Sequence, residues 1–216
     1  MIPTTNSASE LVPNREFTKL ADEEQIKRVV QALEANNMHT IVVETGADAK
    51  KIVLELVPEG AEVYTNQSKT LEKLDLFADF DKSGRYQAVR PKVMALDRKT
   101  QSDEIRKLRS GPDTIIGSIQ AITEKGQVLT ASFGGSQLGA YVYGSRKVIW
   151  VVGTQKLVKD LDGGFRRIKE YCYPLEDARL LAVLGIHSGI GKTLIIDREA
   201  VPGRITIVLV KEELGF

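Results

Sequence analysis

Lys147-Val-Ile-Trp-Val-Val-Gly153 is the most apolar segment of this 216-residue chain, and it decides the fold class. A short run of β-branched and aromatic side chains predicts a buried strand, because such side chains are stiff and pack well on a sheet. The other long apolar runs are also strand-sized, and a helix needs about 20 apolar residues to cross a bilayer. The sequence therefore predicts no membrane partner.

Strand-like and helix-like patterns alternate on both sides of this segment. Apolar residues at helical spacing, such as Ile26, Val29, Val30 and Leu33, indicate helices between the strands. Strands are expected at 39–44, 61–65, 113–119, 127–132, 193–197 and 204–210. Helices are expected at 22–36, 47–57, 68–77, 100–111, 137–144, 157–168 and 174–185. This alternation predicts an α/β fold with a mostly parallel sheet flanked by helices.

Two regions depart from the alternation. Residues 120–126 suggest a turn or short helix. No helix separates the last two strands, which predicts one antiparallel pairing near the end of the chain. Residues 1–20, with Pro3 and Pro13, are interpreted as an N-terminal arm, and 21–216 as a single domain.

The composition excludes several classes of partner and of metal site. Lys and Arg total 30 against 29 Asp and Glu, so the formal charge of +1 argues against a nucleic-acid partner. The single cysteine, Cys172, excludes a disulfide within the chain and a cysteine-rich zinc or iron–sulfur site, and it is interpreted as a packed thiol. Two histidines disfavour a metal centre. No signal-peptide pattern opens the sequence, so we expect a cytoplasmic protein. We also expect no cofactor.

The segment Gly185-Ile-His-Ser-Gly-Ile-Gly-Lys192-Thr193 resembles a phosphate-binding loop but lacks its spacing. That loop needs a glycine where Ile186 stands, and it lies between a strand and a helix. Here a predicted helix precedes it and a strand follows. We therefore expect a helix end at Gly185 and a flexible turn, with Lys192 directed toward the ligand crevice.

The segment from Glu124 to Ser136 carries more promising chemistry. The loop after the strand at 127–132 contains Ser132, Gly134, Gly135 and Ser136, and its backbone N–H groups and hydroxyls suit a carboxylate or phosphate. Glu124 precedes Gly126 in a turn where a ligand would approach closely. An ordinary glycine turn with a solvated glutamate remains the alternative. Ser68 and Thr70 mark another strand-to-helix crossing, where helix capping is the simpler reading.

These motifs together resemble the lactate utilisation (LUD) domain family. The resemblance rests on Glu124-x-Gly126, the 132–136 loop, Lys156 after the apolar strand, Ser68-x-Thr70, and the closing segments around Lys192 and Arg204, and it runs from about residue 20 to the end. It implies a fold similar to CoA transferases and ribose-5-phosphate isomerase, and a part in oxidising L-lactate to pyruvate. A partner subunit would carry the iron–sulfur clusters. The chain has Glu-Lys-Gly where many members have Glu-Thr-Gly.

Two functional hypotheses follow. In the first, the chain is a non-redox subunit that binds a small carboxylate or a phosphorylated ligand, with cationic contacts from Lys156, Lys192 or Arg204. In the second, Glu124 is the nucleophile or general base of a stand-alone enzyme acting on a small carboxylate, CoA ester or sugar phosphate. An exposed apolar helix face would permit a homodimer.

Overall fold

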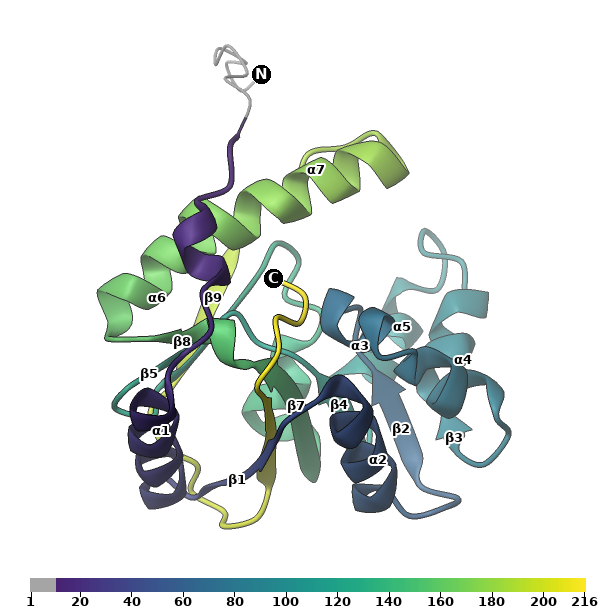
Figure 1. Cartoon of the computed structure of the whole chain (residues 1–216). Helices are drawn as coiled ribbons and strands as arrows, with labels where there is room; N and C mark the ends of the chain where they lie inside the picture. Colours follow the sequence, from purple (N-terminus) through teal and green to yellow (C-terminus); the bar gives the residue numbers. More distant parts are fainter. Residues whose placement is uncertain (1–10) are drawn as a thin grey trace.

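The computed structural model describes residues 11–216 and confirms the α/β fold (Figure 1). Its larger sheet has six strands in the order β1-β10-β7-β4-β2-β3, and every pairing in it is parallel. The strands are β1 (Met38–Val43), β2 (Glu62–Thr65), β3 (Gln87–Ala88), β4 (Thr114–Gly117), β7 (Lys147–Gly153) and β10 (Ile205–Val210).

The apolar strand β7 lies inside this sheet and supplies both hydrophobic cores. Val148, Trp150 and Val152 pack in one core, whereas Ile149 and Val151 pack in the other. Helix α1 (Glu23–Ala35) contributes to the first core and α2 (Gly46–Leu56) to the second, so helices cover both faces of the sheet. A strand with successive side chains on two buried faces needs apolar residues at every position, which explains the uninterrupted run.

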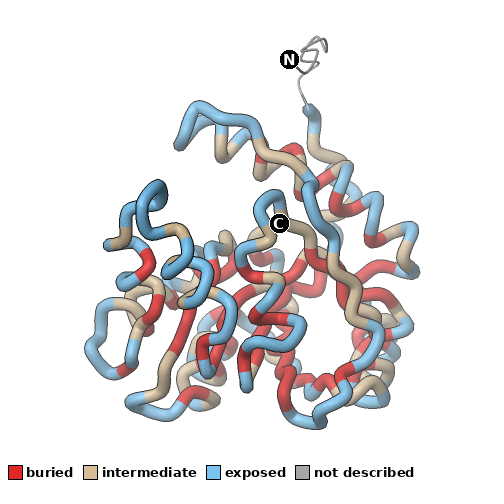
Figure 2. The backbone as a smooth tube through the Cα atoms, turned by 180° about the vertical axis from the view of Figure 1, so that it is seen from behind, coloured by how far each residue is buried: buried red, intermediate tan, exposed pale blue. Residues whose placement is uncertain are grey.

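Most of the remaining helical segments lie between strands along the chain. Figure 2 shows buried residues gathered along the strands, with exposed residues on the outer helices and at the end of α7. The other helical segments are η1 (Arg15–Thr18), α3 (Lys69–Lys73), η2 (Ala78–Lys82), α4 (Val89–Ala95), α5 (Ser102–Ser110), η3 (Ala140–Gly144), η4 (Thr154–Lys156), α6 (Leu161–Arg167), η5 (Ile168–Cys172) and α7 (Tyr173–Leu184). None of the helices in residues 11–216 is long and apolar enough to cross a membrane.

A second sheet of four strands was not expected. Its order is β8-β5-β6-β9, with β6 antiparallel to both neighbours. The strands are β5 (Ala121–Thr123), β6 (Val128–Ser132), β8 (Leu157–Val158) and β9 (Lys192–Ile196). Helix α6 packs on this sheet, where Gly164 lies against Leu129.

Three sequence-based expectations are wrong in detail. The last two strands do not pair: β10 lies between β1 and β7, and β9 pairs with β6 in the smaller sheet. Residues 121–123 form a strand, and Leu157–Val158 form a strand before the helix begins at Leu161. Each short segment gains its strand partners only through tertiary contacts, which local propensity does not report. Half of the predicted N-terminal arm, residues 1–10, lies outside the described part of the chain. The other half contains η1 and is held to the domain by the Asn14 N–H, which donates to the Glu170 backbone oxygen at 2.8 Å.

Candidate functional site

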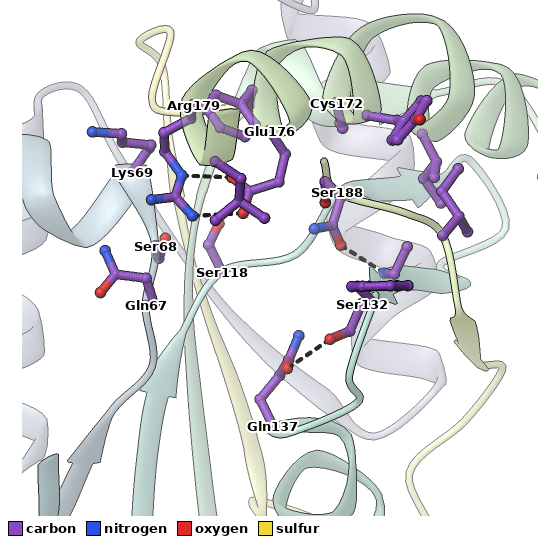
Figure 3. A pocket seen from close by; sticks show the side chains of 18 of the residues that line it. Gln67, Ser68, Lys69, Ser118, Ser132, Gln137, Cys172, Glu176, Arg179 and Ser188 are labelled. Atoms are coloured by element: carbon purple, nitrogen blue, oxygen red, sulfur yellow. Dashed lines mark hydrogen bonds and ion pairs between the residues drawn. The ribbon is translucent and has the colours of Figure 1, made fainter. Parts of the chain in front are cut away.

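A cavity of about 280 Å³ opens where the parallel strands β2 and β4 end (Figure 3). Crevices at the carboxyl ends of parallel strands are common ligand sites, and this volume suits a small molecule. Its walls are rich in neutral polar side chains. The amides are Asn66, Gln67, Gln120 and Gln137. The serine hydroxyls are Ser68, Ser118, Ser132, Ser136 and Ser188.

Two loops after strands form the lower walls. After β2, Ser68 caps α3, its hydroxyl accepting a hydrogen bond from the Thr70 backbone N–H at 3.2 Å. After β6, the Ser132 hydroxyl accepts from the Gly135 N–H at 2.9 Å and bonds the Gln137 amide oxygen at 3.2 Å. Gly135 has φ +81°, a conformation that favours glycine, so the sequence Gly134-Gly135 lets this loop close on itself.

The upper wall comes from α7 and the loop that follows it. In Figure 1, α7 passes above the carboxyl ends of the strands. Glu176 and Arg179, one helical turn apart, form an ion pair at 2.6 Å at the cavity wall. The loop is tied to α7 because Asp177 accepts from the Ser188 N–H at 2.6 Å and contacts His187 at 2.9 Å. These hydrogen bonds hold the pKa of Asp177 below its usual range, His187 contributing most.

The loop 185–191 is therefore part of the site without being a phosphate-binding loop. Gly185 ends α7 with φ +69°, as the sequence predicted. Ser188, Gly189 and Ile190 line the cavity. The segment that resembles a nucleotide loop thus contributes a wall through its middle residues, whereas its Gly-Lys-Thr ending enters β9.

Lys156 lies beneath the cavity floor and is completely buried. Its Nζ donates to the Ser118 hydroxyl at 3.0 Å, the Thr70 hydroxyl at 3.2 Å and the Phe216 backbone oxygen at 3.4 Å. In residues 11–216 no carboxylate side chain pairs with it. Burial, followed by the positive charge of Arg167, lowers the pKa of Lys156 to about 7.

Arg167 is a second buried cation in this region. It donates to the backbone oxygens of Gln155 and Gln120 and to the Cys172 sulfur, and its Nη2 has no partner in the described chain. Burial raises the pKa of the Cys172 thiol, although Arg167 opposes this, so Cys172 is neutral. Two buried basic side chains, neither paired with an acidic side chain in residues 11–216, make the surroundings of the cavity favourable for an anion.

The structure brings six of the sequence-predicted residues together. Ser68, Ser132, Gly134 and Ser136 line the cavity, while Thr70 and Lys156 lie directly beneath it. Gly135 and Lys192 lie next to each other at its edge: a Cβ on Gly135 would stand 2.7 Å from the Lys192 Cδ. Neither is a lining residue, and Lys192 is exposed.

Glu124, Gly126 and Arg204 lie elsewhere. Glu124 is 30% exposed and forms an ion pair with Arg28 at 3.1 Å. Gly126 has φ +74° and packs against the Ala32 backbone, so it serves the β5–β6 turn. Arg204 is buried just before β10 begins, at the amino ends of the parallel strands and so away from the cavity, where it pairs with Glu199 at 2.6 Å. The geometry therefore favours a structural role for these three residues.

Sequence reasoning missed several residues that define the site, including Ser118, Gln120, Arg167 and Arg179. Ser118 and Gln120 follow strand β4, which ends at Gly117. The strand-end rule applied to the expected strand at 113–119 would have identified Gln120, but it would have left Ser118 inside the strand. Arg167 and Arg179 gave no such signal, because basic residues on helices are usually solvated. Among the described residues, no group of acidic, histidine or cysteine side chains has the arrangement of a metal site.

Comparisons with known proteins agree with this architecture. A sequence model of the LUD domain matches residues 26–210. Among solved structures, a DUF162 family protein from Deinococcus radiodurans superposes with a TM-score of 0.56 at 11% identity, covering 89% of this chain and 99% of that chain. At this identity the likeness shows the fold alone. No curated protein matches the sequence.

Proposed function

Because the chain belongs to the LUD domain family, we propose that it is a non-redox, small-carboxylate-binding subunit, or a relative of one, in a system that oxidises L-lactate to pyruvate. The family is associated with lactate utilisation. The ligand is a small carboxylate, and the redox step belongs to an iron–sulfur partner.

One observation carries the proposal: the buried Lys156 amine lies under the cavity floor, where its contacts in residues 11–216 are two hydroxyls and the Phe216 oxygen, and no acidic side chain pairs with it. The cations that line the cavity, Lys69 and Arg179, are each paired with a glutamate, so they add little net charge. A carboxylate in the cavity would compensate Lys156 through the Ser118 hydroxyl, in surroundings where solvent screens charge weakly. The amides and hydroxyls of the walls suit the remaining polar atoms of a hydroxy or keto acid.

The first experiment compares ligands that have nearly the same shape but differ in charge. Isothermal titration calorimetry should detect L-lactate or pyruvate, and the neutral analogue lactamide should bind at least about tenfold more weakly, or ~1.4 kcal/mol. Lys156→Met should reduce carboxylate affinity similarly, while the matched exposed variant Lys159→Met should not. Equal affinity for lactate and lactamide would contradict the proposal.

The second experiment concerns the partner. Purification of the tagged chain from its own cells should recover an iron–sulfur protein, identified by its absorption spectrum and by mass spectrometry. If no such protein is recovered, the subunit part of the proposal fails and only carboxylate binding remains. The alternative, a stand-alone enzyme with Glu124 as its nucleophile, finds no support in a glutamate that lies outside the cavity and pairs with Arg28.

A further inference from the structure

The side chains of Ser118 and Lys156 contact each other at the carboxyl ends of neighbouring strands. Ser118 follows β4 and Lys156 follows β7, and these strands are paired in parallel. Their Oγ and Nζ atoms are 3.0 Å apart. Ser118 lines the cavity, whereas Lys156 is enclosed behind it. The sheet therefore fixes a hydroxyl between a small-molecule cavity and a buried amine.

We propose that Ser118 and Lys156 form a nucleophile–base pair that cleaves small esters or thioesters by acyl transfer through Ser118. This activity rests on the proposed function, because the acid released is the small carboxylate that the cavity binds. A serine held by a lysine is one of the recurring arrangements for nucleophilic catalysis.

The surroundings of Lys156 supply a base near neutral pH. Burial and then Arg167 lower its pKa to about 7, and Cys172, which opposes this shift, is itself a neutral thiol. Tyr141 contacts the Ser118 backbone and stays neutral, since burial raises its pKa. A general base is most effective when its pKa lies near the working pH.

The hydrogen bonds of Ser118 are compatible with this role. While Lys156 is protonated, its Nζ donates to the Ser118 Oγ, and the Ser118 hydroxyl donates to the Val151 backbone oxygen at 2.7 Å. When Lys156 loses a proton, its lone pair becomes an acceptor, and the hydroxyl proton can rotate toward it. The Thr70 hydroxyl accepts from the Lys156 Nζ and lies within donating distance of both the Ser118 Oγ, at 3.3 Å, and the Leu214 backbone oxygen, at 3.1 Å. Thr70 is buried and does not line the cavity, so Ser118 is the hydroxyl that a substrate can reach.

The reaction balances without a cofactor. The Ser118 Oγ bonds to the acyl carbon and its proton passes to the Lys156 Nζ; the bond to the leaving oxygen or sulfur breaks, and the leaving group takes that proton. Water then attacks the acyl-serine and gives a proton to Lys156, which returns it to the Ser118 Oγ as the acid leaves. Asn66 and Gln120 border the same cavity and carry amide N–H groups suited to the transient oxyanion.

A fluorophosphonate probe tests the pair directly, because it reacts with activated serines. Mass spectrometry of the labelled wild-type chain should place the adduct on Ser118. Ser118→Ala should abolish labelling and hydrolysis of p-nitrophenyl acetate, and the distant control Ser102→Ala should stay within about twofold. Lys156→Met and Lys156→Arg should both slow labelling by about 100-fold or more, since arginine keeps the charge but cannot act as a base.

The wild-type chain also gives a readout that needs no variant. Its labelling rate should rise with pH through about 7 and then level off, following the deprotonation of Lys156. Absence of an adduct, an adduct on another residue, or a rate that is flat between about pH 6 and 8 would overturn the pair. Carboxylate binding without labelling would overturn this inference alone, whereas labelling without carboxylate binding would overturn the proposed function and leave the pair standing.

Discussion

Lys156 links the stability of the fold to pH. Its pKa is about 7 when folded and 10.5 when unfolded, so the unfolded chain binds more protons between these values. The free energy of unfolding should therefore rise as pH climbs from about 7 to about 10, by an amount on the order of 3–5 kcal/mol from this group. Urea denaturation at intervals across that range measures it.

The Lys156→Met variant isolates this contribution. Methionine keeps the length of the side chain and has no proton to bind, so the difference in unfolding free energy between wild type and variant should change with pH only above about 7. Lys159→Met, on an exposed lysine, should follow the wild-type curve. A constant difference between wild type and Lys156→Met from pH 6 to 10 would contradict the assignment.

The sequence pointed to some of the residues that border the cavity. Ser68, the serines of the 132–136 loop and Lys156 stand next to recognisable strand ends, so position along the chain sufficed. Glu124 and Arg204 carry equally suggestive chemistry, but their ion pairs with Arg28 and Glu199 come from segments distant in sequence. A charged residue's role depends on which partner the fold supplies, and one sequence does not state that partner.

Among the elements, the β5–β6 turn depends on Gly126. Its φ is +74°, and a Cβ there would stand 2.8 Å from the Ala32 carbonyl carbon in α1. Gly126→Ala should lower the free energy of unfolding by about 1–3 kcal/mol, combining backbone strain with displacement of the helix. Gly60→Ala is the matched control, because Gly60 also has a positive φ of +78° but nothing lies within 4 Å.

Chemical denaturation of both glycine variants separates the two contributions. Gly60→Ala should cost only about 1 kcal/mol of strain, and carboxylate binding should survive in both. Equal losses would show that contact with α1 contributes nothing. A loss of binding in Gly126→Ala without a loss of stability would restore the ligand-contact role that the sequence suggested.

The loop after α7 depends on Asp177. Its carboxylate holds the Ser188 N–H and His187, and residues 188–190 form one wall of the cavity. Asp177→Ala should speed hydrogen exchange at Ser188 by about tenfold or more and weaken carboxylate affinity several-fold, because the wall loses its tether. The control, Asp103→Ala, removes an exposed carboxylate paired with Arg106 in α5 and should change neither. Unchanged exchange at Ser188 would refute the tether.

The bounds of the strands were easier to predict than the strands with which they pair. Strands β1, β2, β6 and β7 lie within a residue or two of their expected bounds, since apolar patterning marks them locally. The division into two sheets was missed because β9 and β10 look alike in sequence. β10 is buried at every position, whereas β9 is exposed or half-buried throughout, and only that difference in burial separates a central strand from an edge strand.

At the scale of the whole molecule, the cavity is where the parts of the fold meet. The larger sheet contributes Asn66 and Ser118, the smaller sheet contributes Ser132, and α7 with its loop contributes Arg179 and Ser188. A ligand that fills the cavity therefore contacts all three parts at once. Ligand binding stabilises the native state by about 2.7 kcal/mol when the free ligand is at 100 times Kd.

Hydrogen exchange followed by mass spectrometry should show this coupling. Saturating L-lactate or pyruvate should slow exchange together in 66–70, 118–120, 132–137 and 186–190, and should raise the melting temperature by several degrees. The outer helices α4 and α5, which do not border the cavity, should be protected only to the extent that global stability rises. Protection confined to one wall would mean that the ligand binds at the rim, and the three parts would then not share a common site.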